Sequence, residues 1–195
     1  MKRLFSLPTA ALIGLFGTSG AHSAAEQVEL YGLTIGAPFT IPPCLPNGSF
    51  ESFEAATTFT CYWTEKPEAV GKPDGELLIK FATPAAFTTT GSVGVVVLDG
   101  ILDGIEIETT GTESGEQVLS LLTTRLGKPN AARSSPVQNA YGAKFTRISA
   151  TWKLGAITVE FDSAPERIDE GEITAATSVG RSFLDAKHHV SSTPM

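Results

Sequence analysis

Hydrophobic residues alternate with polar residues in the segments 76–81, 143–152 and 156–161 of this chain. This is the spacing of β-strands with one buried face. The residues expected to point inward are Leu77, Ile79 and Phe81 in the first segment, Ile148, Ala150 and Trp152 in the second, and Ile157, Val159 and Phe161 in the third. The pattern therefore predicts three strands of a sheet that covers a core on one side.

A β-hairpin is expected between residues 93 and 109. The run VGVVVL is rich in β-branched residues, and the pair Asp99-Gly100 that follows it is typical of a two-residue hairpin turn. After the turn, Ile105 and Ile107 alternate with Glu106 and Glu108. The second strand should therefore present its glutamates to solvent.

One amphipathic helix is expected in SGEQVLSLLTTRLGKPN, residues 114–130. Its apolar stripe consists of Val118, Leu119, Leu122 and Leu126, at helical spacing. Ser114 and Gln117 match a capping box at its start. Gly127 and Pro129 are typical of the end of a helix.

The order of these elements predicts an α+β fold, a twisted antiparallel sheet with this one main helix packed on one face. Further strands are expected in 28–41 and 58–63, and a weaker one in 172–180. We expect a single domain over residues 25–185 and a frayed tail over 186–195. A boundary near residues 82–92, dividing the chain into two parts, remains an alternative.

The N-terminus has the pattern of a Sec-type signal peptide. Lys2 and Arg3 precede the short apolar stretch 9–17, and small residues follow it. The apolar stretch is shorter than the roughly 20 residues that a membrane-spanning helix needs. We therefore expect residues 1–24 to be cleaved and the protein to be periplasmic or secreted, without stable insertion in a membrane.

The net charge narrows the choice of partners. It is −7 for the whole chain, and removal of the signal leaves 12 Lys and Arg against 21 Asp and Glu, or −9. A chain this acidic lacks the positive charge with which proteins bind nucleic acid or anionic lipid. We expect no nucleic-acid partner.

Cys44 and Cys61 are the two cysteines of the chain. They lack the further ligands of a zinc site and the Cys-x-x-Cys spacing of redox proteins. In an oxidising compartment two such cysteines most simply form a structural disulfide. Free thiols are the alternative.

Aromatic residues gather around the second cysteine, among them Phe53, Tyr62 and Trp63. Two interpretations stay open. These side chains either cap the core beside the disulfide or form an exposed surface that binds a partner, since Tyr and Trp are favoured anchors at interfaces.

Candidate catalytic groups are few. Asp99, Asp103 and Glu106 form a weak acidic cluster that would suit a solvated sheet face, a carboxylate-dependent glycan hydrolase or a calcium site. The adjacent His188 and His189 lie in the expected tail, where weak metal binding is the alternative to a solvated pair. The sequence contains none of the common hydrolase or nucleotide-binding motifs.

The helix ending LLTTRLGKP beside antiparallel strands resembles the small periplasmic modules related to outer-membrane assembly lipoproteins and β-lactamase inhibitor proteins. In those modules a helix ending in Leu-Gly-x-Pro packs on a short sheet. This chain lacks their lipid-attachment cysteine. The resemblance covers about a third of the chain and implies protein–protein binding rather than catalysis.

The sequence thus favours an exported, non-enzymatic module that binds another protein or envelope material and requires no cofactor. A carboxylate-dependent glycan hydrolase and a carrier of a small ligand or lipid are the alternatives.

Overall fold

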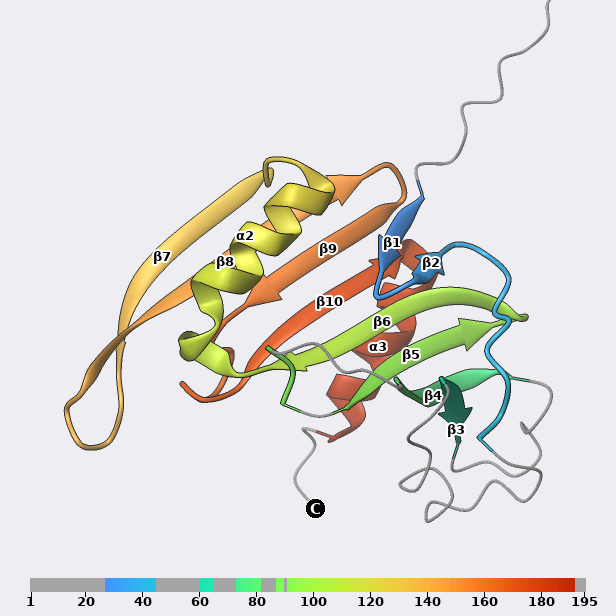
Figure 1. The fold of residues 1–195 in the computed structure, drawn as a ribbon, viewed down its shortest axis with the longest axis horizontal. Coiled ribbons are helices and arrows are strands. Elements are labelled where there is room, and N and C mark those ends of the chain that lie inside the picture. Colours follow the sequence, from blue (N-terminus) through green and yellow to red (C-terminus); the bar gives the residue numbers. More distant parts are fainter. Residues whose placement is uncertain (1–26, 45–59, 65–72, 82–86, 90, 192–195) are drawn as a thin grey trace, which may run out of the picture.

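The computed structural model describes residues 27–44, 60–64, 73–81, 87–89 and 91–191. Side chains are described as far as residue 186. The main element of the fold is an eight-stranded antiparallel sheet with the strand order β3-β4-β5-β6-β10-β9-β8-β7 (Figure 1). The strands are β3 (Cys61–Trp63), β4 (Gly75–Lys80), β5 (Ser92–Leu98), β6 (Ile101–Thr109), β7 (Ala131–Gln138), β8 (Lys144–Leu154), β9 (Ile157–Asp162) and β10 (Gly171–Thr177).

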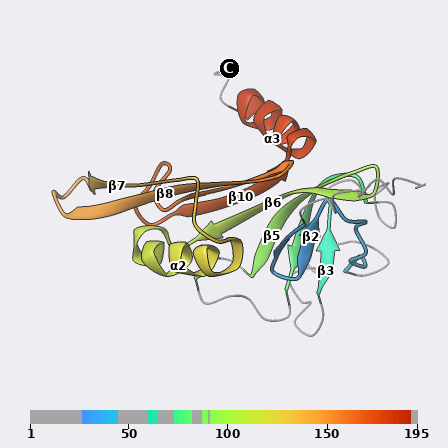
Figure 2. The same ribbon diagram turned by 90° about the horizontal axis from the view of Figure 1, so that it is seen from above.

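A separate small hairpin and the helices cover the two faces of the sheet. The hairpin consists of β1 (Val28–Leu30) and β2 (Leu33–Ile35). It lies on the same face as the helix α2 (Gly115–Leu126), which follows the short 3-10 helix η2 (Gly111–Glu113), whereas α3 (Ser178–Ser191) lies on the opposite face (Figure 2). The result is three layers, with the sheet in the middle.

The main core lies between the sheet and the layer formed by α2 and the β1–β2 hairpin. One row of paired buried residues crosses six neighbouring strands and consists of Leu77, Val95, Ile105, Ala175, Val159 and Trp152. Trp152 is completely buried, and its indole N–H donates to the carbonyl of Gly127 at 2.8 Å. A smaller apolar cluster of Val96, Ala176 and Leu184 seats α3 on the other face.

Several expectations from the sequence are confirmed. The fold is α+β, and the sheet is antiparallel. The alternating residues of β8 and β9 point into the core as predicted. Asp99 and Gly100 form the β5–β6 turn, both with positive φ, and Gly127 ends α2 with φ +80°.

The C-terminal region differs from the expectation. Residues 186–191 belong to α3 rather than to a frayed tail, so the sheet carries two helices on opposite faces instead of one main helix. The sequence signal was weak because α3 rests on the sheet through few apolar side chains, chiefly Leu184 and the half-buried Phe183. Its position depends on the strands beneath it.

The expected capping box of α2 is also wrong. Ser114 does precede the helix, but its side chain makes no capping hydrogen bond and instead approaches the carbonyl of Gly111 at 3.5 Å. The short helix η2 leads directly into α2, which leaves Ser114 buried in a turn rather than in the extended conformation of an N-cap.

The expected cleavage segment 1–24 lies outside the described residues. β4 and β5, on either side of the alternative boundary near 82–92, are neighbouring strands of the same sheet. Among the helices that the structure describes, none has both the length and the apolarity to cross a membrane.

Candidate functional site

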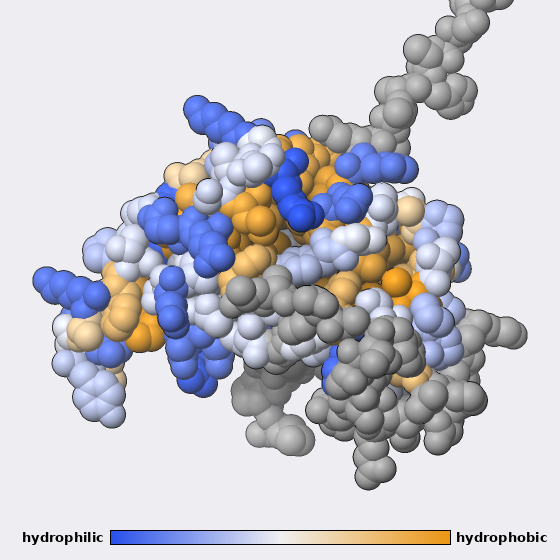
Figure 3. Space-filling model, in the orientation of Figure 1, coloured by the Kyte–Doolittle hydropathy of each residue, from blue (hydrophilic) through white to orange (hydrophobic). Residues whose placement is uncertain are grey.

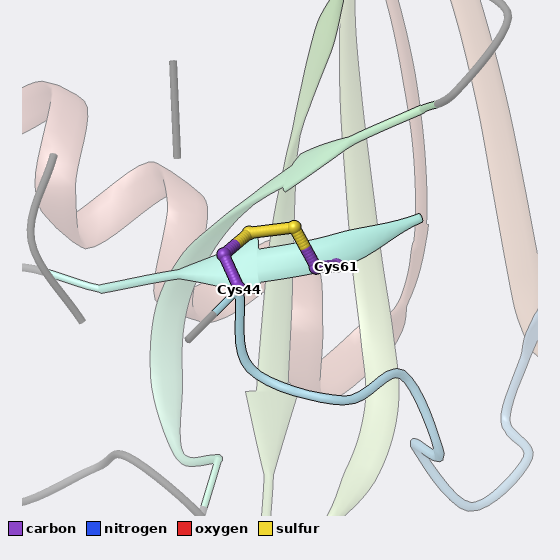
Figure 4. Close-up of a disulfide and its surroundings, with 2 residues drawn as sticks. All are labelled: Cys44 and Cys61. Carbon is purple, nitrogen blue, oxygen red and sulfur yellow. A yellow bond between two sulfur atoms is a disulfide. The ribbon is translucent and has the colours of Figure 1, made fainter. Parts of the chain in front are cut away.

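The two cysteines form the expected disulfide, which joins the segment after β2 to the edge strand β3 (Figure 4). Both cysteines are buried, and the half-buried Trp63 and Leu78 pack beside them. The backbone N–H of Cys44 also donates to the carbonyl of Tyr62 at 3.0 Å. The disulfide therefore fixes a segment that already lies along β3.

The structure buries one of the two aromatic candidates that it describes at this strand. Tyr62 is 2% exposed and faces the main core, where its ring lies edge-on to Phe39 at a centroid distance of 5.7 Å. Trp63 is half-buried and packs beside the disulfide. Phe53 lies outside the described residues. For Tyr62 the burial supports a role in the core, and it removes this side chain from any exposed surface.

The structure does not bring the three acidic candidates together. Asp99 lies in the β5–β6 turn, where its N–H approaches the carboxylate of Asp74 at 3.3 Å. Asp103 accepts a hydrogen bond from Thr177 at the start of α3. Glu106 lies further along β6, on the sheet face opposite the main core. This arrangement gives no support to a paired-carboxylate mechanism.

The sheet face beside α3 carries a shallow polar groove of about 320 Å³. Its lining includes Ser149, Thr151, Glu160, Asp162, Glu172, Thr174 and Arg181. Most charges here are already paired. Arg181 binds Glu160, and Arg147 binds Asp162, whose hydrogen bonds raise the pKa of Arg147. Among the described residues, no three Asp, Glu, His or Cys side chains are close enough to hold a metal ion.

An apolar hollow of about 150 Å³ lies between the β1–β2 hairpin, α2 and β10. In Figure 3 hydrophobic surface gathers in the area between α2 and this hairpin. A cavity of that size holds one benzene-sized molecule, whereas pockets for drug-sized ligands start at about 300 Å³. The hollow therefore does not support a lipid carrier.

The most distinctive feature is an arm made by the far ends of β7 and β8. β9 pairs with β8 only from Ser149 to Leu154, whereas β7 continues along β8 to the pair Gln138 and Lys144. The arm, defined here as residues 134–148, thus projects as a two-stranded ribbon beyond the sheet (Figures 1 and 2). Its base is fixed by Ile148, whose N–H donates to the Ser163 hydroxyl at 2.8 Å.

The tip of the arm is a hydrogen-bonded loop that presents Tyr141. The side-chain oxygen of Asn139 accepts from the N–H groups of Tyr141 and Ala143 at 3.0 and 2.9 Å. The backbone N–H groups of Asn139 and Gly142 close the loop further, and the Gln138 amide donates to the Gly142 carbonyl. The side chain of Tyr141 is nevertheless 96% exposed. The ring of Tyr141 is therefore held on an ordered loop without a partner among the described residues.

The arm is not evident from the hydrophobic pattern of the sequence, because β7 lacks an apolar alternation. All of its residues are exposed except the half-buried Val137. One signal was available. The run NAYG contains Asn and Gly around an aromatic residue, as expected for a turn between two strands.

The fold and the arm define an α+β domain with a projecting β-hairpin as its candidate binding element. No family model matches the chain, and no curated protein matches it either. One solved structure is similar to it, a DUF4309 family protein (YjgB) from Bacillus subtilis. The two are 16% identical over 66% of this chain and 78% of the other, with a TM-score of 0.29. A likeness at this level carries no argument about fold or function.

Proposed function

We propose that this protein is an exported, non-enzymatic module that binds another protein through the arm. The observation that carries the proposal is Tyr141, 96% exposed on a hydrogen-bonded tip. Tyrosine is enriched among the residues that dominate binding energy. A tip that is already ordered loses little conformational entropy when a partner binds.

Export is part of the same proposal. The N-terminal segment has the pattern of a cleavable signal, and a buried disulfide suits an oxidising compartment such as the periplasm or the cell exterior. The acidic groups on β6 and the small apolar hollow give less support to a hydrolase or a carrier, for the reasons given above.

Photo-crosslinking from the arm tip tests this function. A photoreactive amino acid replaces Tyr141 in the full-length chain, expressed in its own host, and illumination should join the protein to one defined partner, identified by mass spectrometry. Val179, an exposed hydrophobic residue on α3, is the matched control position. The same products from positions 141 and 179, or none from position 141, would overturn the proposal.

A further inference from the structure

The arm and its surroundings are basic, although the protein as a whole is acidic. Residues 117–159 contain six cationic side chains and no Asp or Glu, while the whole chain has 21 acidic residues against 14 basic ones. The six are Arg125, Lys128, Arg133, Lys144, Arg147 and Lys153. Arg147 is paired with Asp162, and the other five are exposed and make no ion pair within the described part of the chain.

A groove of about 540 Å³ lies where the arm meets the start of α2. It is lined by Thr112, Glu113, Glu116, Phe145, Thr146 and Ile148. We call it the arm-base groove. Phe145 is half-buried and supplies apolar surface, Ile148 is 3% exposed and belongs to the main core, and Glu113 and Glu116 are exposed. Neither glutamate has an ion pair among the described residues. The groove therefore combines an apolar wall with two unpaired negative charges.

We propose that the arm-base groove binds the arm tip of a second copy of this chain. The ring of Tyr141 packs on Phe145 of the other copy, and the ammonium group of Lys144 pairs with its Glu113 and Glu116. A cavity of about 150 Å³ holds benzene, so the groove has room for the phenol ring and part of the lysine. This inference rests on the proposed function and identifies its partner.

The geometry of the arm suits a two-fold dimer. Lys144, the first residue of β8, and Ile148 at the arm base are separated by four positions, which corresponds to about 13 Å along a strand. Two arms lying antiparallel about a two-fold axis would therefore place each tip at the groove of the other copy. Each copy then uses the same surface, as in a closed isologous dimer. A two-stranded ribbon is only marginally stable in water by itself, and the second arm would support it.

The exposed edge of β7 is unsuited to the alternative mode, in which strands of two sheets pair edge to edge. The N–H of Asn139 donates to the carbonyl of Ala143 at 3.0 Å, and antiparallel hydrogen bonding alternates along the ladder. Pro136 therefore lies at a position where a backbone N–H would point away from β8, toward the free edge. Proline has no backbone N–H, so no donor is present there. A proline at this position protects a free sheet edge from pairing with another strand. Binding is therefore expected through the side chains and the tip of the arm.

Sedimentation velocity of the purified mature protein, over a range of concentrations, tests the inference. Two short arms form a small interface, so we expect a dimer with a dissociation constant on the order of micromolar. Tyr141→Ala and Lys144→Glu should each weaken it about tenfold or more, while Val179→Ala should leave it unchanged. The double variant Glu113→Lys/Glu116→Lys should be monomeric.

Mixing the charge variants gives the sharpest result. Lys144→Glu and Glu113→Lys/Glu116→Lys should each be mainly monomeric alone but should form a mixed dimer together. In that dimer the mutated tip meets the mutated groove, and the natural tip meets the natural groove. Circular dichroism checks that each variant is folded, and Glu113→Gln/Glu116→Gln replaces the lysine variant if that one is not.

A monomer at all concentrations, or a dimer unaffected by Tyr141→Ala and the charge variants, would overturn the inference. The proposed function fails separately. If the wild-type protein is monomeric but position 141 crosslinks to a different protein, self-docking is wrong and the binding function stands. If position 141 crosslinks to nothing, the function itself is wrong.

Discussion

Asp103 on β6 accepts a hydrogen bond from the hydroxyl of Thr177, 74 residues later, at an oxygen–oxygen distance of 2.6 Å. The same hydroxyl accepts from the N–H of Gly180 in the first turn of α3 at 3.1 Å. Thr177 thus satisfies a free N–H at the helix start and connects the helix to the sheet. One of the predicted acidic candidates has a structural role here.

Thr177→Val should lower the free energy of unfolding by about 1–2 kcal/mol, because it removes both the cap and the partner of a half-buried carboxylate. Urea denaturation measures the change. Thr158→Val is the control, since Thr158 lies on the neighbouring strand β9 opposite Ala176 and makes no hydrogen bond through its side chain to a described residue. Equal effects of the two substitutions would contradict the capping role of Thr177.

Gly180→Ala should also destabilise the protein, by about 1–3 kcal/mol. An added Cβ at Gly180 would collide with the backbone of Asp103. In an unhindered helix the same change is stabilising by up to about 1 kcal/mol. The sign of the change in stability therefore shows whether the collision occurs. Thermal unfolding measures it, with Ser182→Ala on the exposed side of α3 as the control. A higher melting temperature for Gly180→Ala would show that α3 does not lie this close to β6.

Replacing both Cys44 and Cys61 by Ala should lower the free energy of unfolding by roughly 3 kcal/mol, the value expected for closing a loop of this length. The fold should remain, because the cysteines lie outside the main core. Urea denaturation compares the variant with the oxidised parent. The reduced parent is the control and should match the variant, and a parent insensitive to reduction would contradict the prediction.

Tyr31→Phe should stabilise the protein by about 1 kcal/mol. The Tyr31 ring packs between Phe81 and Phe87, but its hydroxyl is buried without a hydrogen-bond partner among the described residues. Such a group costs about 1–3 kcal/mol of desolvation. Denaturation at neutral pH measures the gain. Tyr141→Phe, which changes a hydroxyl in water, should have no effect on stability.

The same residue makes stability depend on alkaline pH. Burial raises the pKa of Tyr31, and the positive charge of Arg125 lowers it by a smaller amount. The Tyr31 hydroxyl therefore loses its proton at a lower pH in the unfolded chain, near 10, than in the folded protein. The free energy of unfolding is not affected by this group below about pH 10 and decreases as the pH rises further. Tyr31→Phe should lose less stability than the parent between pH 9 and about 11. An identical loss in both would contradict the assignment.

Asp162→Asn should loosen the arm more than it destabilises the protein. The Arg147–Asp162 pair is partly exposed, so its loss should cost no more than about 1 kcal/mol. Hydrogen exchange should nevertheless become faster in residues 134–147, because Arg147 connects the arm to β9. Glu160→Gln, which breaks the neighbouring pair with Arg181, is the control and should not change exchange in the arm.

The sequence by itself determined the local elements. Alternation placed the inward residues of β8 and β9, because a strand with one buried face requires period-two spacing. The Asp99-Gly100 turn was readable because only a few residues accept positive φ. The end of α2 followed from Gly127 in the same way. The disulfide followed from the absence of any other suitable chemistry for two cysteines.

Tertiary structure decided what depends on neighbouring strands. The alternation in β3 could not say which side faces the core, and the pairing with β4 turned Tyr62 inward and Trp63 toward the disulfide. α3 exists where it does because β5, β6 and β10 provide its apolar seat. The arm is defined by where β9 stops pairing with β8. Tyr141 became a candidate only once its exposure was known, since a pattern of residues records types and spacing but not which surfaces the fold leaves uncovered.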